Sequence, residues 1–376
     1  MTGARQTGLD LLRALAIVLT CAMHFVWAIG AWRYERNFEV FPISAARSVD
    51  EALWMWLYHS QHGVYLFFVL SGYLLSKRWL VERKATLGRY LIDRAWRTLP
   101  GAWLALLVAM GLLAAAGKMP SNAALLFLEN AFFLNWFRAD DLHHLLIITW
   151  SLQAEWLFYL ALPIVAWCAQ RAGGARRMQV ATVLLFGAAA IVLLKLTSVR
   201  GAAYALFFIT GALCALMQDQ WRGFVRSAPW WAIITAYVGV NGLYAWSTAT
   251  AARLQAPGFG AFELHATAFA FIAGLMALKA VEHTFDNGWL VRLGQHIGRI
   301  SYSIYLWHLL VMLTLMQWFG LPSRLDFLPD GLAVAAFLSL LIGVTWLVSL
   351  LSFALIERPY FARRNVSAVH ALKSKD

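Results

Sequence analysis

Two ionisable residues in the first apolar block, Arg13 and His24, offer the clearest chemistry in the sequence. The block runs over 9–31, and an ionisable side chain inside such a block is costly, so it usually faces a cavity or a partner. At 100° per residue, a helix brings both side chains onto one face, about 16 Å apart along its axis. For either residue alone a structural interpretation is equally open: Arg13 extends to lipid headgroups and His24 packs against its neighbours.

Other polar groups recur inside later apolar blocks. Glu155 follows Trp150 in the run Trp-Ser-Leu-Gln-Ala-Glu, and a buried acid needs a partner or a proton. His308 closes the run that begins at Ser301, again inside an apolar block. Ser71 precedes Gly72 and Tyr73, and such small pairs more often serve close helix packing than chemistry.

These residues must be positioned by membrane-spanning helices, because 61% of the 376 residues are hydrophobic and only 13% are charged. About 20 apolar residues in a helix cross a ~30 Å hydrocarbon core. The sequence predicts an all-α integral membrane protein of about ten transmembrane helices. A shorter apolar segment at 121–137, interrupted by Glu129 and Asn130, predicts an interfacial or re-entrant helix. The ten blocks cover 9–31, 62–80, 98–117, 144–170, 178–196, 200–218, 229–248, 262–281, 298–319 and 330–356.

Orientation follows from the distribution of basic residues. When the connections alternate between the two sides, the side of the N-terminus holds 22 of the 31 Lys and Arg residues. The positive-inside rule therefore predicts that both termini are cytoplasmic. Topology and contact with anionic lipids account for most of the net charge of +12. Nucleic-acid binding is not expected, since no recognition motif accompanies the charge.

The remaining features limit other classes of function. Cys21, Cys168 and Cys214 lie in separate apolar blocks without ligand spacing, so no disulfide framework or metal site is expected. The first block lacks the small-residue cleavage site of a signal peptide. We expect one membrane domain over 1–360 with no appended soluble domain, followed by a short basic cytoplasmic tail at 361–376.

Six ordered motifs make the chain resemble the acyltransferase-3 family of bacterial membrane O-acyltransferases. The strongest is Gly8 to Arg13 together with His24, and the family's usual pair of acids after Trp-Ser-Leu is reduced here to Glu155, with Trp156 in the second position. Only Glu155 therefore inherits a role. The other motifs are Gly63–Gly72, Arg94–Pro100, Trp150–Tyr159, Ser301–His308 and Glu357-Arg358-Pro359.

The resemblance implies transfer of an acyl group, commonly acetyl, from cytoplasmic acyl-CoA to a glycan hydroxyl outside the inner membrane. His24 would activate that hydroxyl as a general base or carry the acyl group itself. Glu155 would orient or charge His24, although a buried ion pair is equally consistent with a structural role. The implied co-substrate is acetyl-CoA or another acyl-CoA, with no metal.

Further residues take supporting roles under the same resemblance. Arg13 suits the phosphates of CoA, because a guanidinium pairs with phosphate in a fixed fork. Arg94 and Arg97, one helical turn apart, could do the same, with ordinary positive-inside charge as an equal alternative. The remaining candidates for binding or supporting the substrate are Ser71, Tyr73, Trp150 and His308. His308 could be a positioning residue, a second base or a packing residue.

The acceptor side leaves alternatives open. A lipid-linked saccharide or a surface polysaccharide is the leading acceptor, and a small sterol-like or antibiotic acceptor is second. A transporter or flippase of a lipid-linked sugar or acyl group is the rival class, although no paired interrupted helices support it. Aromatic side chains in the predicted outer loops suit sugar rings, but an ordinary interfacial belt is the better explanation for them: Trp32, Tyr34, Trp54, Trp56, Tyr58 and Trp136. The histidines of these loops are similarly ambiguous: His59, His62, His143 and His144.

Overall fold

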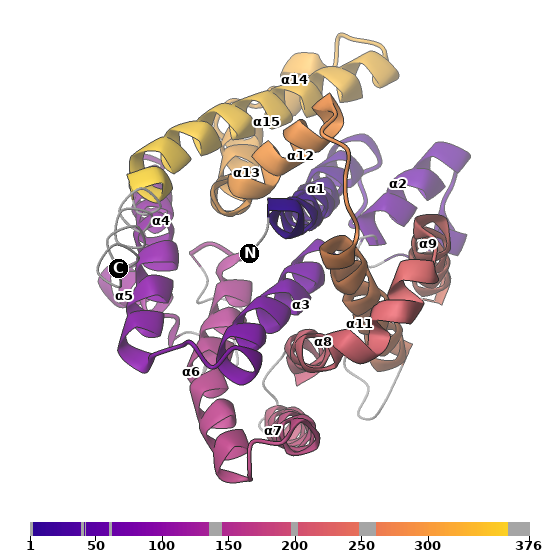
Figure 1. Ribbon diagram of the computed structural model, residues 1–376. Coiled ribbons are helices and arrows are strands. Elements are labelled where there is room, and N and C mark those ends of the chain that lie inside the picture. Colours follow the sequence, from indigo (N-terminus) through magenta and orange to yellow (C-terminus); the bar gives the residue numbers. More distant parts are fainter. Residues whose placement is uncertain are drawn as a thin grey trace. The chain divides into compact units, whose positions relative to one another are not determined.

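The computed structural model is all-helical over the residues that it describes (Figure 1). The structure describes residues 3–38, 41, 43–59, 62–134, 145–196, 202–247 and 261–359. Trp136, His143, His144 and the predicted tail at 361–376 lie outside these ranges. The helices are α1 Gly3–Arg33, α2 Val49–His59, α3 Gly63–Ser76, α4 Leu87–Ala115, α5 Ala123–Ala131, α6 Thr149–Arg171, α7 Arg176–Leu196, α8 Ala202–Ser227, α9 Trp230–Ser247, α11 Ala261–Glu282, α12 Trp289–Arg299, α13 Ser301–Gln317, α14 Leu321–Leu325 and α15 Asp330–Ser352. Two π-helical turns, Lys77–Val81 and Phe353–Glu357, extend α3 and α15.

The predicted helical membrane architecture is confirmed, and each of the ten apolar blocks holds a helix. Within the described residues, six helices are long and apolar enough to cross a membrane, or seven if the bent pair α12–α13 is one span. A total of about ten crossings stays a prediction. The short segment predicted at 121–137 forms α5, which has nine residues and rises only about 14 Å.

Two helices lie where the sequence predicted other structure. The predicted outer loop at 32–61 contains α2, whose apolar run is too short to read as a separate span. The Glu51 carboxylate in its first turn is buried, and it accepts hydrogen bonds from the Arg47 backbone N–H at 2.6 Å and from Arg36 Nη1 at 3.2 Å. The predicted span at 298–319 begins inside α12, which meets α13 at an angle of 72°. The sequence of α12 forms no long apolar block, because its apolar pattern is interrupted by the basic residues Arg292, His296 and Arg299.

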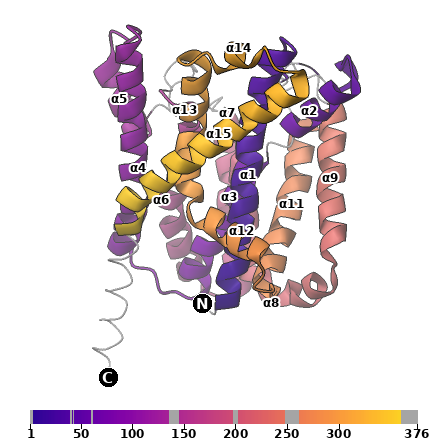
Figure 2. The same ribbon diagram turned by 90° about the horizontal axis from the view of Figure 1, so that it is seen from above.

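The chain divides into two compact units, which we describe separately. Unit 1 comprises 1–84 and 154–301, and unit 2 comprises 85–153 and 302–376. In unit 1, α1 packs against α2, α3, α11 and α12, while α8 packs against α3, α7 and α11. Figure 2 shows α1 running beside α3 and α11. The interpretation of 1–360 as a single domain stays a prediction.

Glycine allows α3 and α8 to pack with their backbones in contact. A Cβ at Gly72 of α3 would lie 2.3 Å from the Phe208 carbonyl oxygen, and one at Gly211 of α8 would lie 2.2 Å from the Val69 carbonyl oxygen. Neither position admits a methyl group without displacing backbone. The close-packing interpretation of the Ser71-Gly72 pair is therefore confirmed for Gly72.

Unit 2 is held by hydroxyl contacts between helices and turns. The Tyr302 hydroxyl of α13 donates to the Thr98 carbonyl of α4, and the Ser303 hydroxyl donates to the Glu357 carboxylate in the π-helical turn after α15. A Cβ at Gly101 of α4 would meet the Tyr302 ring at 3.1 Å. These contacts fix α13 against α4 and the end of α15.

The α3–α8 contact generates a stability prediction. Gly211→Ala should lower the free energy of unfolding by about 1–3 kcal/mol, because the added methyl group overpacks the helix contact. Gly223→Ala is the matched control in α8, because a Cβ there meets nothing within 4 Å. It should be neutral or stabilising by up to about 1 kcal/mol. Thermal unfolding in detergent micelles measures both, and equal unfolding midpoints would contradict the packing argument.

Candidate active site

α1 places Arg13 and His24 as the sequence predicts. The helix is continuous from Gly3 to Arg33, so the two side chains share a face about 16 Å apart along the axis. Arg13 Nη1 donates to Asp10 Oδ1 at 2.7 Å, one turn closer to the N-terminus. A carboxylate therefore already holds the guanidinium that was predicted to bind phosphate, and an anionic ligand would compete with Asp10 for it.

The same turn of α1 lies between two other helices of unit 1. A Cβ at Gly8 would lie 1.9 Å from the Ala280 carbonyl oxygen of α11, and a Cβ at Gly298 of α12 would lie 2.0 Å from the Asp10 carbonyl oxygen. The Gln295 side chain of α12 also donates to the Thr7 hydroxyl at 2.7 Å. These backbone contacts fix the rotation of α1 at the turn that carries Arg13.

His24 is held by its own helix in a defined tautomer. Its Nδ1 lies 3.1 Å from the Thr20 carbonyl oxygen, and because a carbonyl only accepts, Nδ1 carries the proton. In the neutral ring Nε2 then has the lone pair, which is the atom that a general base uses. The ring is only partly buried. Gly63 of α3 lies against this turn, since a Cβ there would be 2.4 Å from Thr20 Oγ1.

The predicted acid, Glu155, is paired with a predicted supporting residue. Ser71 Oγ of α3 donates to Glu155 Oε1 of α6 at 2.6 Å, and both side chains are partly buried. The sequence treated these residues separately, and the structure brings them together within unit 1. The idea that Glu155 orients or charges His24 stays a prediction.

Tyr73 belongs to a polar network that the sequence analysis missed. Its hydroxyl donates to Gln218 Oε1 at 2.8 Å, and Gln218 Nε2 donates to Glu282 Oε1 at 2.8 Å. The Glu282 carboxylate also accepts hydrogen bonds from Arg222 at 3.2 Å and Arg226 at 2.9 Å. The four-residue spacing of Gln218, Arg222 and Arg226 near the end of α8 was the available signal.

The other four predicted residues lie in unit 2. His308 is 0% exposed, and its Nδ1 donates to the Tyr305 carbonyl at 2.7 Å. Arg97 lies partly buried in α4. Arg94 is largely buried, and Trp150 lies partly buried in the first turn of α6. The enclosed ring of His308 favours a packing or positioning role over direct contact with substrate.

A second feature missed by the sequence analysis is a buried pair of histidines. His62 Nε2 at the start of α3 lies 2.6 Å from His265 Nε2 of α11, so one ring donates to the other. Tyr244 stacks on His265 at a centroid distance of 4.0 Å, and Phe269 lies 4.3 Å from His62. His59 is buried at the end of α2. In the part of the chain that the structure describes, no three His, Cys, Asp or Glu side chains gather as a metal site would require.

Comparison with known proteins identifies the family behind this arrangement. A family model described as an acyltransferase domain matches residues 6–354, which include Arg13, His24 and Glu155. The chain belongs to the acyltransferase-3 family. With its apolar helices, this family member is a membrane acyltransferase.

One curated relative matches this acyltransferase-3 protein over most of both chains. It is the Komagataeibacter xylinus protein named "Putative membrane-bound transacylase BcsY", 24% identical over 375 residues that cover 92% of this chain and 90% of the relative. No solved structure matches the chain.

The Ser71–Glu155 hydrogen bond generates a prediction about acyl transfer. Ser71→Ala should lower the turnover number about two- to tenfold, the usual worth of one hydrogen bond, if the bond positions a carboxylate that acts in the reaction. Ser76→Ala is the matched control in α3, because the Ser76 hydroxyl is buried with no hydrogen-bond partner among the described residues. Steady-state kinetics of both variants check this, and equal turnover by Ser71→Ala and wild type would contradict it.

Proposed function

We propose that this membrane acyltransferase moves an acyl group, with acetyl as the first candidate, from cytoplasmic acyl-CoA to a hydroxyl of an extracytoplasmic or lipid-linked glycan. The continuous face of α1, with Arg13 at one end and the Nε2 lone pair of His24 at the other, is the observation that carries the proposal. The name of the relative, "Putative membrane-bound transacylase BcsY", agrees with the reaction class. The protein would cross the bacterial inner membrane about ten times with both termini in the cytoplasm.

The chemistry follows from the tautomer of His24. A sugar hydroxyl is a weak nucleophile near neutral pH, and Nε2 would accept its proton as the oxygen attacks the thioester carbonyl. The new C–O bond forms, the C–S bond breaks, and the proton passes to the CoA thiolate. If the acyl group first moves to the histidine, the same Nε2 is the atom that attacks. Both the direct transfer and the route through an acyl-histidine need Nδ1 to keep the proton that it donates to the Thr20 carbonyl.

Arg13 and His24 would then lie towards opposite sides of the membrane. By the positive-inside rule the turn with Asp10 and Arg13 lies near the cytoplasm, where acyl-CoA is found. His24 lies about 16 Å further along the axis, towards the side of the acceptor. An extended pantetheine arm suits this separation, because it carries the thioester well beyond the phosphates that Arg13 would bind.

The role of His24 generates the first functional prediction. His24→Ala should reduce acyl transfer at least about 10²-fold, the lower range for a lost general base, while acyl-CoA affinity stays near that of wild type. His24→Asn should lose as much, although its amide can still donate to the Thr20 carbonyl. Glu155→Gln should show a milder loss. Release of free CoA from labelled acetyl-CoA by purified protein measures all three variants.

Two results would overturn this assignment. Transfer near the wild-type rate by folded His24→Ala protein would remove His24 from the reaction. Wild-type protein that moves a lipid-linked sugar across vesicles without releasing CoA would point to a transporter instead.

Donor binding generates a separate prediction. Arg13→Ala and Arg94→Ala should each weaken acyl-CoA binding about tenfold or more if their guanidinium groups bind phosphate, because charge-assisted hydrogen bonds contribute about 1.5–3 kcal/mol each. Arg89→Ala, at an exposed position of the same basic segment, is the control and should leave the affinity near that of wild type. Calorimetry in detergent micelles gives the dissociation constants. If both variants bind as tightly as the control, neither arginine belongs to the donor site.

A further inference from the structure

The helix α12 of unit 1 divides its side chains into three sectors around its axis. Its two glycines, Gly294 and Gly298, share the first sector. The second sector spans about 100° and is wholly apolar. It consists of Trp289, Leu290, Leu293 and Ile297. The third sector spans about 60° and is basic. It consists of Arg292, His296 and Arg299.

The glycine sector packs against α1. A Cβ at Gly298 would lie 2.0 Å from the Asp10 carbonyl oxygen, and a Cβ at Gly294 would lie 2.4 Å from the Leu11 side chain. Figure 2 shows α12 beside the N-terminal part of α1. Since the glycines occupy the contact with α1, the apolar and basic sectors are turned away from that helix.

Both of these sectors are exposed on the described part of the protein. Trp289 is 67% exposed, Leu290 63% and Leu293 42%. The side chains of Arg292 and Arg299 are exposed beside them. A guanidinium is costly in hydrocarbon, and large apolar side chains are unfavourable in water. An apolar sector next to a basic one is typical of a helix that lies along a membrane surface.

The position of α12 in the chain places it on the cytoplasmic side. By the positive-inside rule, α11 ends at Glu282 near the cytoplasm, and so does the N-terminal part of α1. Only residues 283–288 connect α11 to α12. Asp286 is the one acidic residue between 283 and 301, so the segment carries an excess of positive charge. The cytoplasmic leaflet, in turn, has a negative surface potential.

We propose that α12 lies in the cytoplasmic headgroup layer of the membrane and binds an anionic phospholipid, with Arg292 and Arg299 on its phosphate and the apolar sector among the acyl-chain carbons nearest the headgroups. A guanidinium pairs with phosphate in a fixed fork. Ordinary contact between a spanning helix and lipid would explain the apolar sector, but it would not explain the basic sector beside it. The charge therefore selects an anionic lipid over a zwitterionic one.

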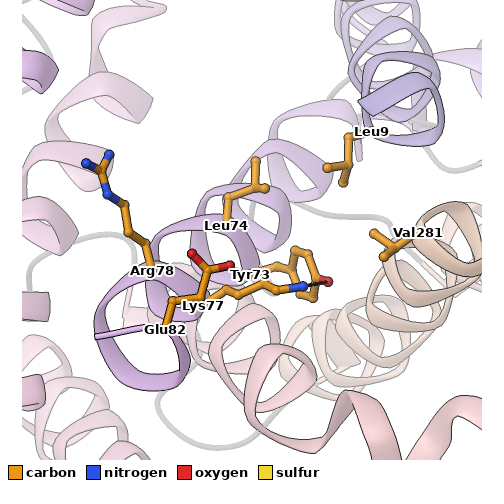
Figure 3. Close-up of a pocket in the computed structure, with 7 residues that line it drawn as sticks. All are labelled: Leu9, Tyr73, Leu74, Lys77, Arg78, Glu82 and Val281. Atoms are coloured by element: carbon orange, nitrogen blue, oxygen red, sulfur yellow. Dashed lines mark hydrogen bonds between the residues drawn. The ribbon is translucent and has the colours of Figure 1, made fainter. Parts of the chain in front are cut away.

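A lipid bound to α12 would also hold the turn of α1 that carries Arg13. Because the two helices touch through backbone, α12 cannot move towards α1 without displacing this turn. On another side of the same turn, Leu9 lines a pocket of about 120 Å³ with Tyr73 of α3 and Val281 of α11 (Figure 3). Lipid binding should therefore slow the local opening of the first turns of α1. An effect on the donor site would follow only if Arg13 binds acyl-CoA, and that step rests on the proposed function.

Native mass spectrometry of the delipidated protein, titrated with phosphatidylglycerol or phosphatidylcholine, tests the lipid assignment. Wild-type protein should bind phosphatidylglycerol more tightly. The double variant Arg292→Gln/Arg299→Gln should lose at least about tenfold in affinity for phosphatidylglycerol, because each basic residue near an anionic surface contributes about fivefold. Its affinity for phosphatidylcholine should not change. The control Lys84→Gln/Arg177→Gln removes two exposed charges elsewhere in unit 1 and should behave as wild type.

Hydrogen–deuterium exchange tests the link to α1. Phosphatidylglycerol should slow amide exchange in peptides that cover 3–13 and 289–299 of the wild-type protein and of the control. The Arg292→Gln/Arg299→Gln protein should show no such protection at the same lipid concentration.

Each contrary result removes a defined part of the proposal. Equal affinity of the two double variants for phosphatidylglycerol, or equal affinity of wild type for the two lipids, would overturn the lipid assignment. If the Arg292→Gln/Arg299→Gln protein loses affinity for CoA and not for phosphatidylglycerol, the anion is the CoA phosphate and the assignment is wrong. Unchanged exchange at 3–13 when lipid binds would overturn the link to α1. Neither measurement requires acyl transfer, so failure of the proposed function would be seen separately in the assay of CoA release.

Discussion

The backbone contacts that glycine permits around α1 are the constraint on which the candidate site depends. Gly8 brings α1 against α11, Gly298 brings α12 against α1, and Gly63 brings α3 against α1. In each case a Cβ would overlap with backbone atoms, so the helices lie closer than side chains would allow. Without water to drive helices together, such close packing supplies much of the association between membrane helices. The rotation of α1, and with it the direction of Arg13 and His24, is set by these contacts.

A second constraint acts on the polar groups themselves. Inside an apolar helix bundle a donor without a partner is costly, so each candidate side chain needs a hydrogen bond that satisfies it. His24 meets this by donating from Nδ1 to its own helix, and Ser71 meets it by donating to Glu155. The Lys77 ammonium likewise donates to the Tyr73 hydroxyl and to Gln218 Oε1. The bonds that satisfy these groups also fix their tautomer or direction.

The sequence predicted the features that depend on one helix at a time. The all-helical membrane architecture, the shared face of Arg13 and His24 and the short helix at 121–137 all follow from apolar length and the 3.6-residue period. The side-chain partners on other helices do not follow from these rules. Ser71 and Glu155 are 84 positions apart, and Tyr73 and Gln218 are 145 apart. Such pairs depend on how neighbouring helices are rotated, and periodicity within one helix carries no information about that. The amphipathic α12 was missed because its basic residues interrupt the apolar block.

The arrangement also bears on how one protein could join reactants from two sides of a membrane. A thioester bound near the cytoplasm and a hydroxyl reached from outside must meet at one atom, and a channel open at both ends would leak ions. In unit 1 the polar groups along α1 lie on a packed helix whose neighbours approach to backbone contact, so a donor that reached from Arg13 to His24 would have to be a thin, flexible arm. Pantetheine is such an arm, because it is long, unbranched for most of its length and uncharged beyond its phosphate. If the donor is acyl-CoA, as proposed, the tight glycine contacts would exclude bulk water while the pantetheine arm could still pass.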